Sequence, residues 1–343
     1  MSVPEKVTTV LIGCGARGVG KHGVLAKNSS KLELVAVCDI DETRLRAASE
    51  TLGVPGEPEL RRILDRKDVD SVIIATSAKS HAAIARAAIQ AGKHVLLEKP
   101  LADTAEASFQ LAEAIEASGL IGIVGYQARF SPFSLALKQE VEIIQPVQLL
   151  ITRQRQPMAQ QYFFPEHYGG VVDTATHEIH LALWLMGGEP ETAYGAVSRG
   201  SILGDETIEY MNLIVEYDGG RRTATVLSSM FGINTPNVIQ IIGQRGSVVS
   251  LDRKTLKVVS HGGIPKPGIR PVLPPDLATR IVELPAETED PTGAMLEHFA
   301  DRITGRVTKQ LGATFREGAY AIAASEAMVE AAETGSRVRL QIK

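Results

Sequence analysis

The sequence feature that most constrains the fold is a glycine-rich turn near the start of the chain. Residues 7–12 are mostly apolar or β-branched, and they lead into Gly13-Cys14-Gly15-Ala16-Arg17-Gly18. In the pattern G-x-G-x-x-G the first glycine allows a tight turn, the second lets a diphosphate approach the backbone, and the third lets a helix pack on the strand. Residues 19–27 can form that helix, and its N-terminus would attract the diphosphate. The turn predicts a dinucleotide site made by Gly13, Gly15, Ala16, Arg17 and Gly18.

An acidic residue at the end of the next strand strengthens this prediction. The strand expected at residues 32–38 ends in Asp39, about 20 residues past the loop, where such sites bind the ribose 2′-hydroxyl. A carboxylate there repels a 2′-phosphate, which favours NAD over NADP, although Arg17, Arg44 or Arg46 could reach a phosphate. Asp39 and Asp41 could each instead cap the helix expected at 42–52. We interpret Asp41 as the cap and Asp39 as the ribose ligand, and NADP stays possible.

The alternation of strands and helices sets the fold class of the first part of the chain. Helices are expected at 57–65, 80–91 and 104–118, and strands at 71–75, 121–125 and directly before Lys99. Strands separated by helical lengths form β-α-β units, which build a doubly wound parallel sheet with helices on both faces. We therefore predict an α/β dinucleotide-binding domain of Rossmann type over residues 1–124.

The remainder, residues 125–343, has a different pattern and is predicted to be an α+β domain with a large, mostly antiparallel open sheet. A helix is expected at 131–144, and the sequence Asp218-Gly219-Gly220 predicts a hairpin turn between two strands. The strands are expected at 147–154, 192–198, 207–217, 221–229, 238–242 and 247–250. Seven prolines in residues 261–291 predict a long excursion with little regular structure. Helices at 292–304 and 314–334 and a strand at 337–342 are expected last, and the terminal helix could pack back on the first domain.

Composition excludes several classes of partner. The 36 basic and 40 acidic residues give a net charge of -4 without a basic tract, so neither a nucleic acid nor an anionic membrane is expected to bind. The N-terminal residues lack the layout of a signal peptide, and no apolar run is long enough to span a membrane. Cys14 and Cys38 have no metal-ligand spacing and are interpreted as buried thiols. We expect a cytoplasmic protein.

A lysine at the end of the strand before residue 99 is the first candidate for chemistry. His94-Val95-Leu96-Leu97 predicts a buried strand, and Glu98-Lys99-Pro100 follows it at the edge where parallel sheets bind ligands. Burial and a neighbouring cationic nicotinamide would both disfavour the ammonium form of Lys99. The loop after the preceding strand faces the same edge, so Thr76 and His81 are further cofactor candidates, with a structural role for His81 equally open.

A helix expected to begin near residue 170 carries the second group of candidates. Asp173, His177, His180 and Trp184 recur at i, i+4, i+7 and i+11, which places them in one stripe that we expect to face a cavity. A histidine held by an aspartate can act as a general base near neutral pH. His177-Glu178-Ile179-His180 differs from the H-E-x-x-H zinc motif, and hydride chemistry needs no Lewis acid, so no metal is predicted.

Several of these features together resemble the glucose-fructose oxidoreductase, inositol dehydrogenase and rhizopine-catabolism (Gfo/Idh/MocA) family. The features are Gly13 to Gly18 with His22, Val37-Cys38-Asp39, Ala75-Thr76 with His81, Ala91-Gly92-Lys93-His94-Val95 running into Glu98-Lys99-Pro100, Gly125-Tyr126-Gln127 with Arg129-Phe130, and Gly169-Gly170 with Asp173 and His177. The chain departs from the family pattern at Ser77, where many members have proline, and at His180, where many have aspartate. A sugar preference is therefore not transferred from any member.

The resemblance implies a Rossmann domain followed by an α/β domain whose open sheet faces partner subunits in a homodimer or homotetramer. It implies that Lys99 contacts both substrate and cofactor, with Asp173 as its polar neighbour and His177 as the acid-base group. Glu98 joins the expected cofactor ligands. The residues expected at the substrate are Lys99, Tyr126, Arg129, Asp173, His177, His180 and Trp184.

The expected activity is hydride transfer between NAD(P) and a secondary carbinol or ketone of a small polyol, sugar derivative or cyclitol. This reaction requires Lys99 and His177 to meet in one pocket. Two alternatives implied by relatives stay open: an NAD-dependent glycosidase that acts by transient oxidation and elimination, and a non-catalytic NAD-sensing regulator.

Overall fold

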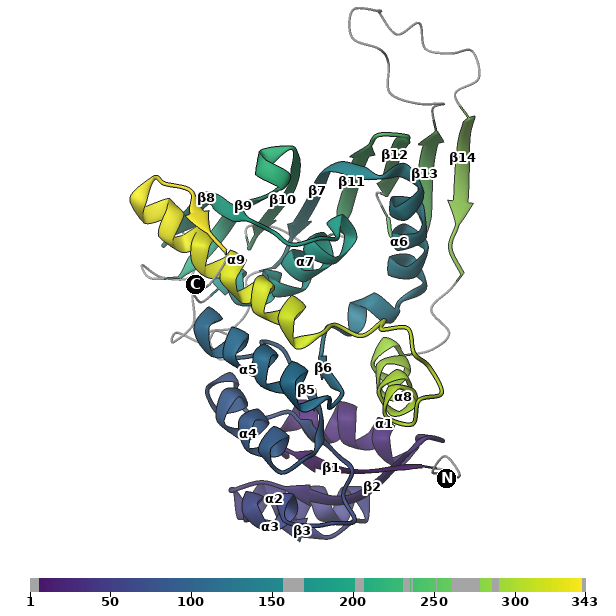
Figure 1. The fold of residues 1–343 in the computed structure, drawn as a ribbon, viewed down its shortest axis with the longest axis vertical. Coiled ribbons are helices and arrows are strands. Elements are labelled where there is room, and N and C mark those ends of the chain that lie inside the picture. The colour runs from purple at the N-terminus through teal and green to yellow at the C-terminus, as the bar shows by residue number, and fades with distance from the viewer. Residues whose placement is uncertain are drawn as a thin grey trace, which may run out of the picture. The chain divides into compact units, whose positions relative to one another are not determined.

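The computed structural model describes residues 6–156, 170–200, 207–230, 235, 237–250, 252–260, 278–285 and 290–340. The chain forms two compact units (Figure 1). Unit 1 is Met1–Phe130 with Thr288–Ile322, and unit 2 is Ser131–Glu287 with Ala323–Lys343. The sequence pattern predicts a single division of the chain, after residue 124, whereas each unit combines two separate segments. None of the described helices is both long and apolar enough to cross a membrane.

Unit 1 contains a six-stranded parallel sheet in the order β3-β2-β1-β4-β5-β6. Its strands are β1 (Val7–Ile12), β2 (Leu32–Cys38), β3 (Gly56–Glu57), β4 (Ser71–Ile74), β5 (His94–Leu97) and β6 (Gly122–Val124). β1 pairs in parallel with both β2 and β4. The four residues of β4 are all buried, as expected for a central strand covered on both faces. The predicted doubly wound parallel sheet is confirmed.

Helices cover both faces of this sheet. They are η1 (Gly18–Gly23), α1 (Val24–Lys27), α2 (Glu42–Leu52), α3 (Leu60–Leu64), α4 (Ala78–Gln90), α5 (Ala105–Ser118), η2 (Gln127–Phe130) and α8 (Pro291–Ile303). α4 and α5 pack against each other, while α1 and α8 lie together and contact β2 (Figure 1). α8 belongs to unit 1 because Met295, Leu296 and Phe299 are fully buried in the same apolar cluster as Leu11 and Val37. The chain thus returns to its first unit after it has built the second.

Unit 2 contains a nine-stranded sheet in the order β14-β13-β12-β11-β7-β10-β9-β8-β15. Its strands are β7 (Pro146–Gln154), β8 (Thr192–Arg199), β9 (Ile208–Tyr217), β10 (Arg222–Ser229), β11 (Val238–Gly243), β12 (Gly246–Ser250), β13 (Thr255–Ser260), β14 (Ala278–Glu283) and β15 (Val338–Arg339). Among the described strand pairs of this second sheet, only β7 and β10 are parallel. The predicted hairpin is confirmed, since η4 (Asp218–Gly220) joins antiparallel β9 and β10.

Helices lie on one face of this sheet. α7 (Gly170–Met186) contacts β7, β9 and β10, and α6 (Pro132–Ile144) contacts β11, β12 and β13 (Figure 1). α9 (Phe315–Thr334) starts in unit 1 and ends in unit 2. Along β7, Leu149 and Ile151 are fully buried whereas Leu150 between them is half-buried, so the helix-covered face is the apolar core. The opposite face carries Leu150, Ile214 and Leu227.

Three strands were not predicted from the sequence. β3 (Gly56–Glu57) lies where a helix over 57–65 was expected to begin, and the helix there, α3, covers only Leu60–Leu64. β13 was not predicted, and β14 lies in residues 261–291, for which little regular structure was expected; that expectation is wrong for 278–283. β13 and β14 pair with each other from Thr255↔Glu283 to Ser260↔Ala278, and Ile281 is largely exposed. β14 gave a weak alternation signal because Ile281 is exposed, and the neighbouring prolines hid it, whereas β13 does alternate, with Leu256 and Val258 fully buried. Residues 261–277 of the same segment lie outside the described part of the chain.

Candidate functional site

The predicted cofactor residues gather at one edge of the unit 1 sheet. They lie in the segments that follow β1, β2, β4 and β5, and these four strands run parallel. Parallel strands end at a common edge, which is where open α/β sheets bind their ligands (Figure 1). The edge therefore brings together the glycine turn, Asp39, the Thr76 loop and Glu98-Lys99.

The glycine turn has the space that a diphosphate needs. Gly13 has φ +102°, and a Cβ there would lie 2.5 Å from the Ala75 carbonyl oxygen. A Cβ on Gly18 would overlap the Gly13 carbonyl oxygen, so both residues must be glycine for packing reasons. A Cβ on Gly15 would meet nothing within 4 Å, so this side of the turn is open. The turn thus leaves an open cradle in front of a helix N-terminus, which fits a dinucleotide.

The helix after the turn begins with a π-helical segment. Residues 18–23 form η1, and α1 continues it to Lys27, whereas the sequence predicted one regular helix over 19–27. π-Turns close over five residues and occur often at functional sites. Here the wider turn lets Arg17 and His22, five residues apart, contact the same carboxylate oxygen of Glu98.

Asp39 braces the glycine turn. One carboxylate oxygen accepts a hydrogen bond from the Cys14 backbone N–H at 2.7 Å, and the other accepts one from the Asp41 N–H at 2.9 Å. Each oxygen keeps a lone pair for a further donor such as a ribose hydroxyl. Asp41 caps α2 by accepting from the N–H groups of Thr43 and Arg44, so its predicted capping role is confirmed.

Glu98 lies at the centre of the site, where its side chain connects three segments. Only 5% of the residue is exposed. Its Oε1 accepts from Arg17 Nε at 2.7 Å and lies 2.6 Å from His22 Nε2, while its Oε2 accepts from the Lys99 backbone N–H at 3.1 Å. A Cβ on Gly125 would lie 3.2 Å from the same carboxylate, so the chain passes close beside it. Glu98 thus fixes the backbone of Lys99 to the helix that follows the glycine turn.

These contacts keep Glu98 charged. Burial raises the pKa of its carboxyl, but the hydrogen bond and charge of His22 and the Arg17 guanidinium outweigh burial and lower the pKa to about 2. His22 is fully buried, and its Nδ1 has no hydrogen-bond partner in the part of the chain that the structure describes. From the sequence, His22 is predicted only to be part of the family pattern after the glycine turn, without a role of its own. Its role in holding Glu98 became evident from the structure, because 76 residues separate the two side chains.

His81 connects the Thr76 loop to the residues after Lys99. Its Nδ1 lies 2.7 Å from the Pro100 carbonyl oxygen and its Nε2 lies 3.2 Å from the Thr76 carbonyl oxygen. The residue is 1% exposed, so this geometry supports a structural role. The Thr76 hydroxyl accepts a hydrogen bond from Ser80 at 2.8 Å. A cofactor contact for His81 or Thr76 stays a prediction.

The other predicted site residues of unit 1 differ in exposure. Lys99 is half-buried, whereas Tyr126 is fully buried. Arg129 is 2% exposed and donates to Glu317 at 2.6 Å and to the Leu311 carbonyl oxygen at 3.1 Å. Burial lowers the pKa of Arg129, and Glu317 opposes that effect. The sequence offered no signal for this ion pair, and a substrate contact for Arg129 stays a prediction.

In unit 2, α7 carries the predicted acid-base group. His177 and Trp184 are half-buried, His180 is 2% exposed, and the side chain of Asp173 lies outside what the structure describes. Lys138 donates to the Trp184 carbonyl oxygen at 2.8 Å, and its Nζ lies 5.5 Å from the indole centroid. The predicted stripe is thus more open at His177 and Trp184 than at His180. Its contact with a substrate stays a prediction.

A buried ion pair beside His177 was not predicted. Arg155 Nη2 donates to Glu178 at 2.6 Å and to the Thr174 carbonyl oxygen at 3.2 Å, and Nη1 donates to the Ser228 hydroxyl at 3.0 Å. The pair ties the ends of β7 and β10 to the first half of α7. Across the described ranges, no three His, Cys, Asp or Glu side chains are grouped so as to hold a metal ion.

Comparison with known proteins identifies the family. The model of the Gfo/Idh/MocA oxidoreductase family, NAD-binding Rossmann fold, matches residues 7–126, and the model of its C-terminal α/β domain matches residues 144–340. The chain is 28% identical to inositol 2-dehydrogenase 2 of Saccharopolyspora erythraea over 97% of this chain and 95% of that protein. It is 30% identical to inositol 2-dehydrogenase of Acidothermus cellulolyticus over 72% of this chain and 74% of that protein.

A solved structure shares the fold over the whole chain. It is levoglucosan dehydrogenase in complex with NADH, with a TM-score of 0.80 at 22% identity, covering 98% of this chain and 100% of that one. The open cradle at Gly15 and the carboxylate of Asp39 fit an NAD molecule. From the glycine turn, the Glu98-Lys99-Pro100 element and the two matched domains, we conclude that the chain belongs to the NAD-binding Gfo/Idh/MocA oxidoreductase family.

Proposed function

We propose that the protein is an NAD-dependent dehydrogenase that oxidises a secondary carbinol of a sugar, sugar derivative or cyclitol, or reduces the corresponding ketone. Two lines of similarity support this substrate class: relatives of the chain are inositol 2-dehydrogenases, and a protein of the same fold is a levoglucosan dehydrogenase. NAD is preferred over NADP in this proposal because Asp39 would repel a 2′-phosphate and its neighbour Ile40 is 92% exposed and uncharged.

The cofactor is held by the edge of the unit 1 sheet. The residues proposed to hold it are Gly13, Gly15, Ala16, Arg17, Gly18, Asp39, Thr76, His81, Glu98 and Lys99. When bound, NAD+ supplies the hydride acceptor for the carbinol carbon. Gly15 leaves its open side to the diphosphate, and Asp39 offers a free lone pair to the ribose while its other lone pairs hold the turn.

The observation that carries the proposal is the pair of contacts made by Glu98. One carboxylate oxygen binds the helix of the glycine turn through Arg17 and His22, and the other binds the backbone N–H of Lys99. A catalytic group must be held within a fraction of an ångström of its productive position. Glu98 gives Lys99 that support and fixes it to the nucleotide-binding turn. A solvated lysine that merely ended a strand would not need such a link.

The chain's own groups then manage the proton and the developing charge. We assign His177 as the general base that takes the hydroxyl proton, with Asp173 as the group that orients it. The Lys99 ammonium stabilises the alkoxide that develops as that proton leaves. For ketone reduction the same groups act in reverse. Tyr126, Arg129, His180 and Trp184 are proposed to border the substrate.

The test is a panel of inositols, aldoses and their glycosides, assayed with NAD+ and in parallel with NADP+. The variant K99A should lower kcat about a hundredfold or more while the Kd for NAD changes little. K67A is the matched control, because Lys67 is exposed and lies before β4, away from the site edge. If Lys99 and His177 act on one substrate, the double variant K99A/H177A should lose little more than the worse single variant.

Three outcomes would contradict the proposal. Unchanged turnover in K99A would remove Lys99 from the chemistry. Release of an aglycone without net NADH would identify the NAD-dependent glycosidase instead. NAD binding without turnover of any panel member would favour the sensing regulator.

We also propose that the protein is a cytoplasmic homo-oligomer, a dimer or tetramer formed through the sheet of unit 2. The uncovered face of that sheet carries half-buried Leu150, Ile214 and Leu227 and the 44% exposed Ile242, which supports burial against a partner. The cytoplasmic location is supported by the buried thiols Cys14 and Cys38, which are free, as is usual in a reducing compartment. Light scattering after size-exclusion chromatography tests the assembly, and a monomer at micromolar concentration would refute it.

A further inference from the structure

Two arginines for which the described part of the chain provides no ion pair lie at one end of the unit 2 sheet. Arg153 is the penultimate residue of β7, and Arg253 follows the end of β12. The register places these segments at a common edge, because Thr152 pairs with Val238 at the start of β11 and Ile239 pairs with Ser250 at the end of β12. Both arginines are half-buried. Within the described residues, neither forms an ion pair.

Arg153 is the more shielded of the two. It shares the helix-covered face with buried Leu149 and Ile151. Its Nη1 donates to the Asn237 side-chain oxygen at 2.7 Å, which is a neutral acceptor. Its Nε is shielded from solvent and has no acceptor among the described residues. A half-buried guanidinium that meets only an amide keeps its full charge uncompensated.

Among the described residues, Glu178 is the carboxylate whose charge acts on Arg153, and it is already paired with another arginine. Glu178 accepts from Arg155 at 2.6 Å, and this pair is itself buried. Burial lowers the pKa of Arg153; Glu178 opposes this effect, while the positive charges of Arg155 and Arg253 reinforce it. Among the described residues that act on Arg153, three guanidinium groups, its own included, therefore face one carboxylate, whereas Arg253 also has the exposed Asp252 next to it in the chain.

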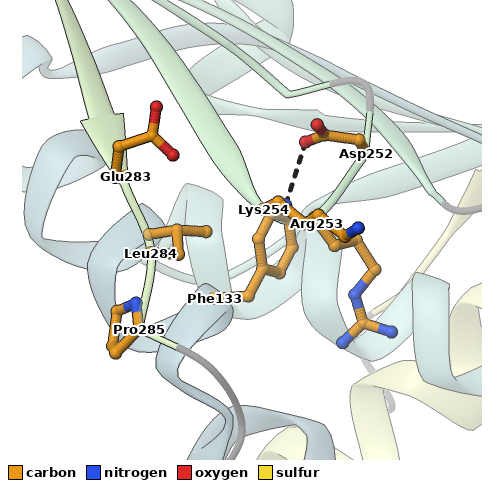
Figure 2. A pocket seen from close by; sticks show the side chains of 7 residues that line it. All are labelled: Phe133, Asp252, Arg253, Lys254, Glu283, Leu284 and Pro285. Carbon is orange, nitrogen blue, oxygen red and sulfur yellow. Dashed lines mark hydrogen bonds between the residues drawn. The ribbon is translucent and has the colours of Figure 1, made fainter.

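The second arginine, Arg253, lines a hollow at this end of the strands. Its guanidinium carbon lies 5.2 Å from the centroid of the Phe133 ring, and its backbone has φ +61°. A hollow of about 530 Å³ is lined by Phe133, Asp252, Arg253, Lys254, Glu283, Leu284 and Pro285. Figure 2 shows the Arg253 guanidinium and the Glu283 carboxylate on different sides of it. The Asp252 carboxylate accepts hydrogen bonds from the backbone N–H groups of Lys254 and Thr255, so it stabilises the turn between β12 and β13.

From these contacts we infer that Arg153 and Arg253 form an oxyanion clamp for a carboxylate or phosphate group on the substrate. Guanidinium groups bind such planar or tetrahedral oxyanions through paired hydrogen bonds, and desolvation strengthens the interaction. The substrate class is therefore an acidic polyol, such as a sugar acid or a sugar phosphate, rather than a neutral sugar. Arg153 and Arg253 act here as specificity-determining residues and take no part in hydride or proton transfer.

The clamp is connected to the helix that carries the proposed base. Arg155 contacts both Glu178 and the Thr174 carbonyl oxygen of α7, within one turn of His177. Arg153 lies near the end of β7, and Arg155, directly after that strand, is close enough for its positive charge to lower the pKa of Arg153. Arg153 and His177 therefore both lie near the place where the end of β7 contacts the first half of α7. The inference that the bound anion is the substrate's own group rests on the proposed function.

Calorimetric titration of the NAD-loaded protein tests the clamp without relying on turnover. The probes are inositols and aldoses, their matched uronates, aldonates and phosphates, and inorganic phosphate. The tightest probe should be an anion, and R153M and R253M should each weaken its binding about tenfold or more. R153K should fall between wild type and R153M, because a lysine keeps the charge but loses the paired geometry.

R245M is the control. Arg245 is exposed in the turn between β11 and β12, which lies at the other end of these strands from Arg153 and Arg253. It removes the same charge and should leave binding unchanged. Thermal melts of all variants verify that each is folded. Carboxylate and phosphate probes are compared directly, and the tighter class identifies the group that the clamp recognises.

The outcomes separate this inference from the proposed function. If anions bind in an Arg153-dependent way but no polyol is oxidised, the clamp stands and the proposed activity fails. If neutral polyols are oxidised as well as their acids and R153M changes nothing, the activity stands and the clamp is refuted. Equal binding of every anionic probe, inorganic phosphate included, by wild type and R153M also refutes it.

Discussion

Replacing Glu98 by glutamine tests the link between the nucleotide turn and Lys99. E98Q keeps the shape of the side chain and removes its charge, so Arg17 and His22 lose their counter-ion. The pKa of Glu98 is lowered from 4.5 to about 2, and the residue is 5% exposed, so solvent screening is small. That difference corresponds to about 3 kcal/mol of folding free energy at neutral pH. For a unit of this size the melting temperature should fall by roughly 6 to 12 °C.

The pH dependence of the loss has a definite sign. Because the folded pKa lies below the ordinary value of 4.5, the stabilisation is complete above pH 4.5 and disappears as the pH falls toward about 2. At pH 3 the difference between wild type and E98Q should therefore be less than half of its value at pH 7. An unpaired surface carboxylate would show no such dependence.

The assay is thermal and urea unfolding followed by circular dichroism, with NAD affinity measured in parallel. E33Q is the matched control, because Glu33 is exposed on β2 and the structure shows no ion pair for it among the described residues. Glu98 and His22 should also be coupled: E98Q/H22Q should be more stable than the sum of the two single losses predicts, by about 1 kcal/mol or more. A melting temperature for E98Q within 2 °C of wild type at pH 7, about the shift expected for a loss under 1 kcal/mol, would refute the argument.

Three further predictions concern the same edge of unit 1. G13A should destabilise the protein by about 2 kcal/mol or more, because φ is +102° and a Cβ would overlap backbone atoms, whereas G15A should melt like wild type but bind NAD more weakly in a fluorescence titration. Burial raises the pKa of both Cys14 and Cys38 to about 12, so neither thiol should react with DTNB at pH 8 until the protein is unfolded; prompt release of two equivalents from native protein would contradict this. D41A should cost about 1 kcal/mol in urea unfolding through loss of the α2 cap, with NAD affinity unchanged.

Local signals in the sequence were sufficient for most of unit 1. Except for β3, which is only Gly56–Glu57 and was not predicted, its strands are short, mostly apolar runs bounded by turn residues. The G-x-G-x-x-G turn requires glycine for reasons that act within a few residues. The same holds for Asp41, whose capping contacts lie two and three residues ahead. Features determined over such short distances are visible in a single sequence.

Contacts between distant segments could not be predicted in this way. Arg129 meets Glu317 across 188 residues, and α8 packs into a core built by the first 130 residues. An isolated Glu317 on an amphipathic helix has the same local pattern whether it pairs with a buried arginine or with water. The exposed β14 shows the converse case, since its pairing with β13 depends on backbone hydrogen bonds that leave little trace in the side-chain pattern.

The two units differ in whether the shielded charges near the proposed catalytic residues Lys99 and His177 have a partner of opposite sign. In unit 1 the buried charges of Glu98 and Arg129 are each paired, Glu98 with the more exposed Arg17 and Arg129 with the more exposed Glu317. In unit 2 the Arg155 charge is matched by Glu178, but Arg153 has no such partner among the described residues. Charged groups removed from water are almost always paired, and the shielded Nε of Arg153 has no acceptor among the described residues. The uncompensated positive charge at the end of β7 is therefore the feature from which a substrate preference should follow, whereas the glycine turn and Glu98 determine the cofactor.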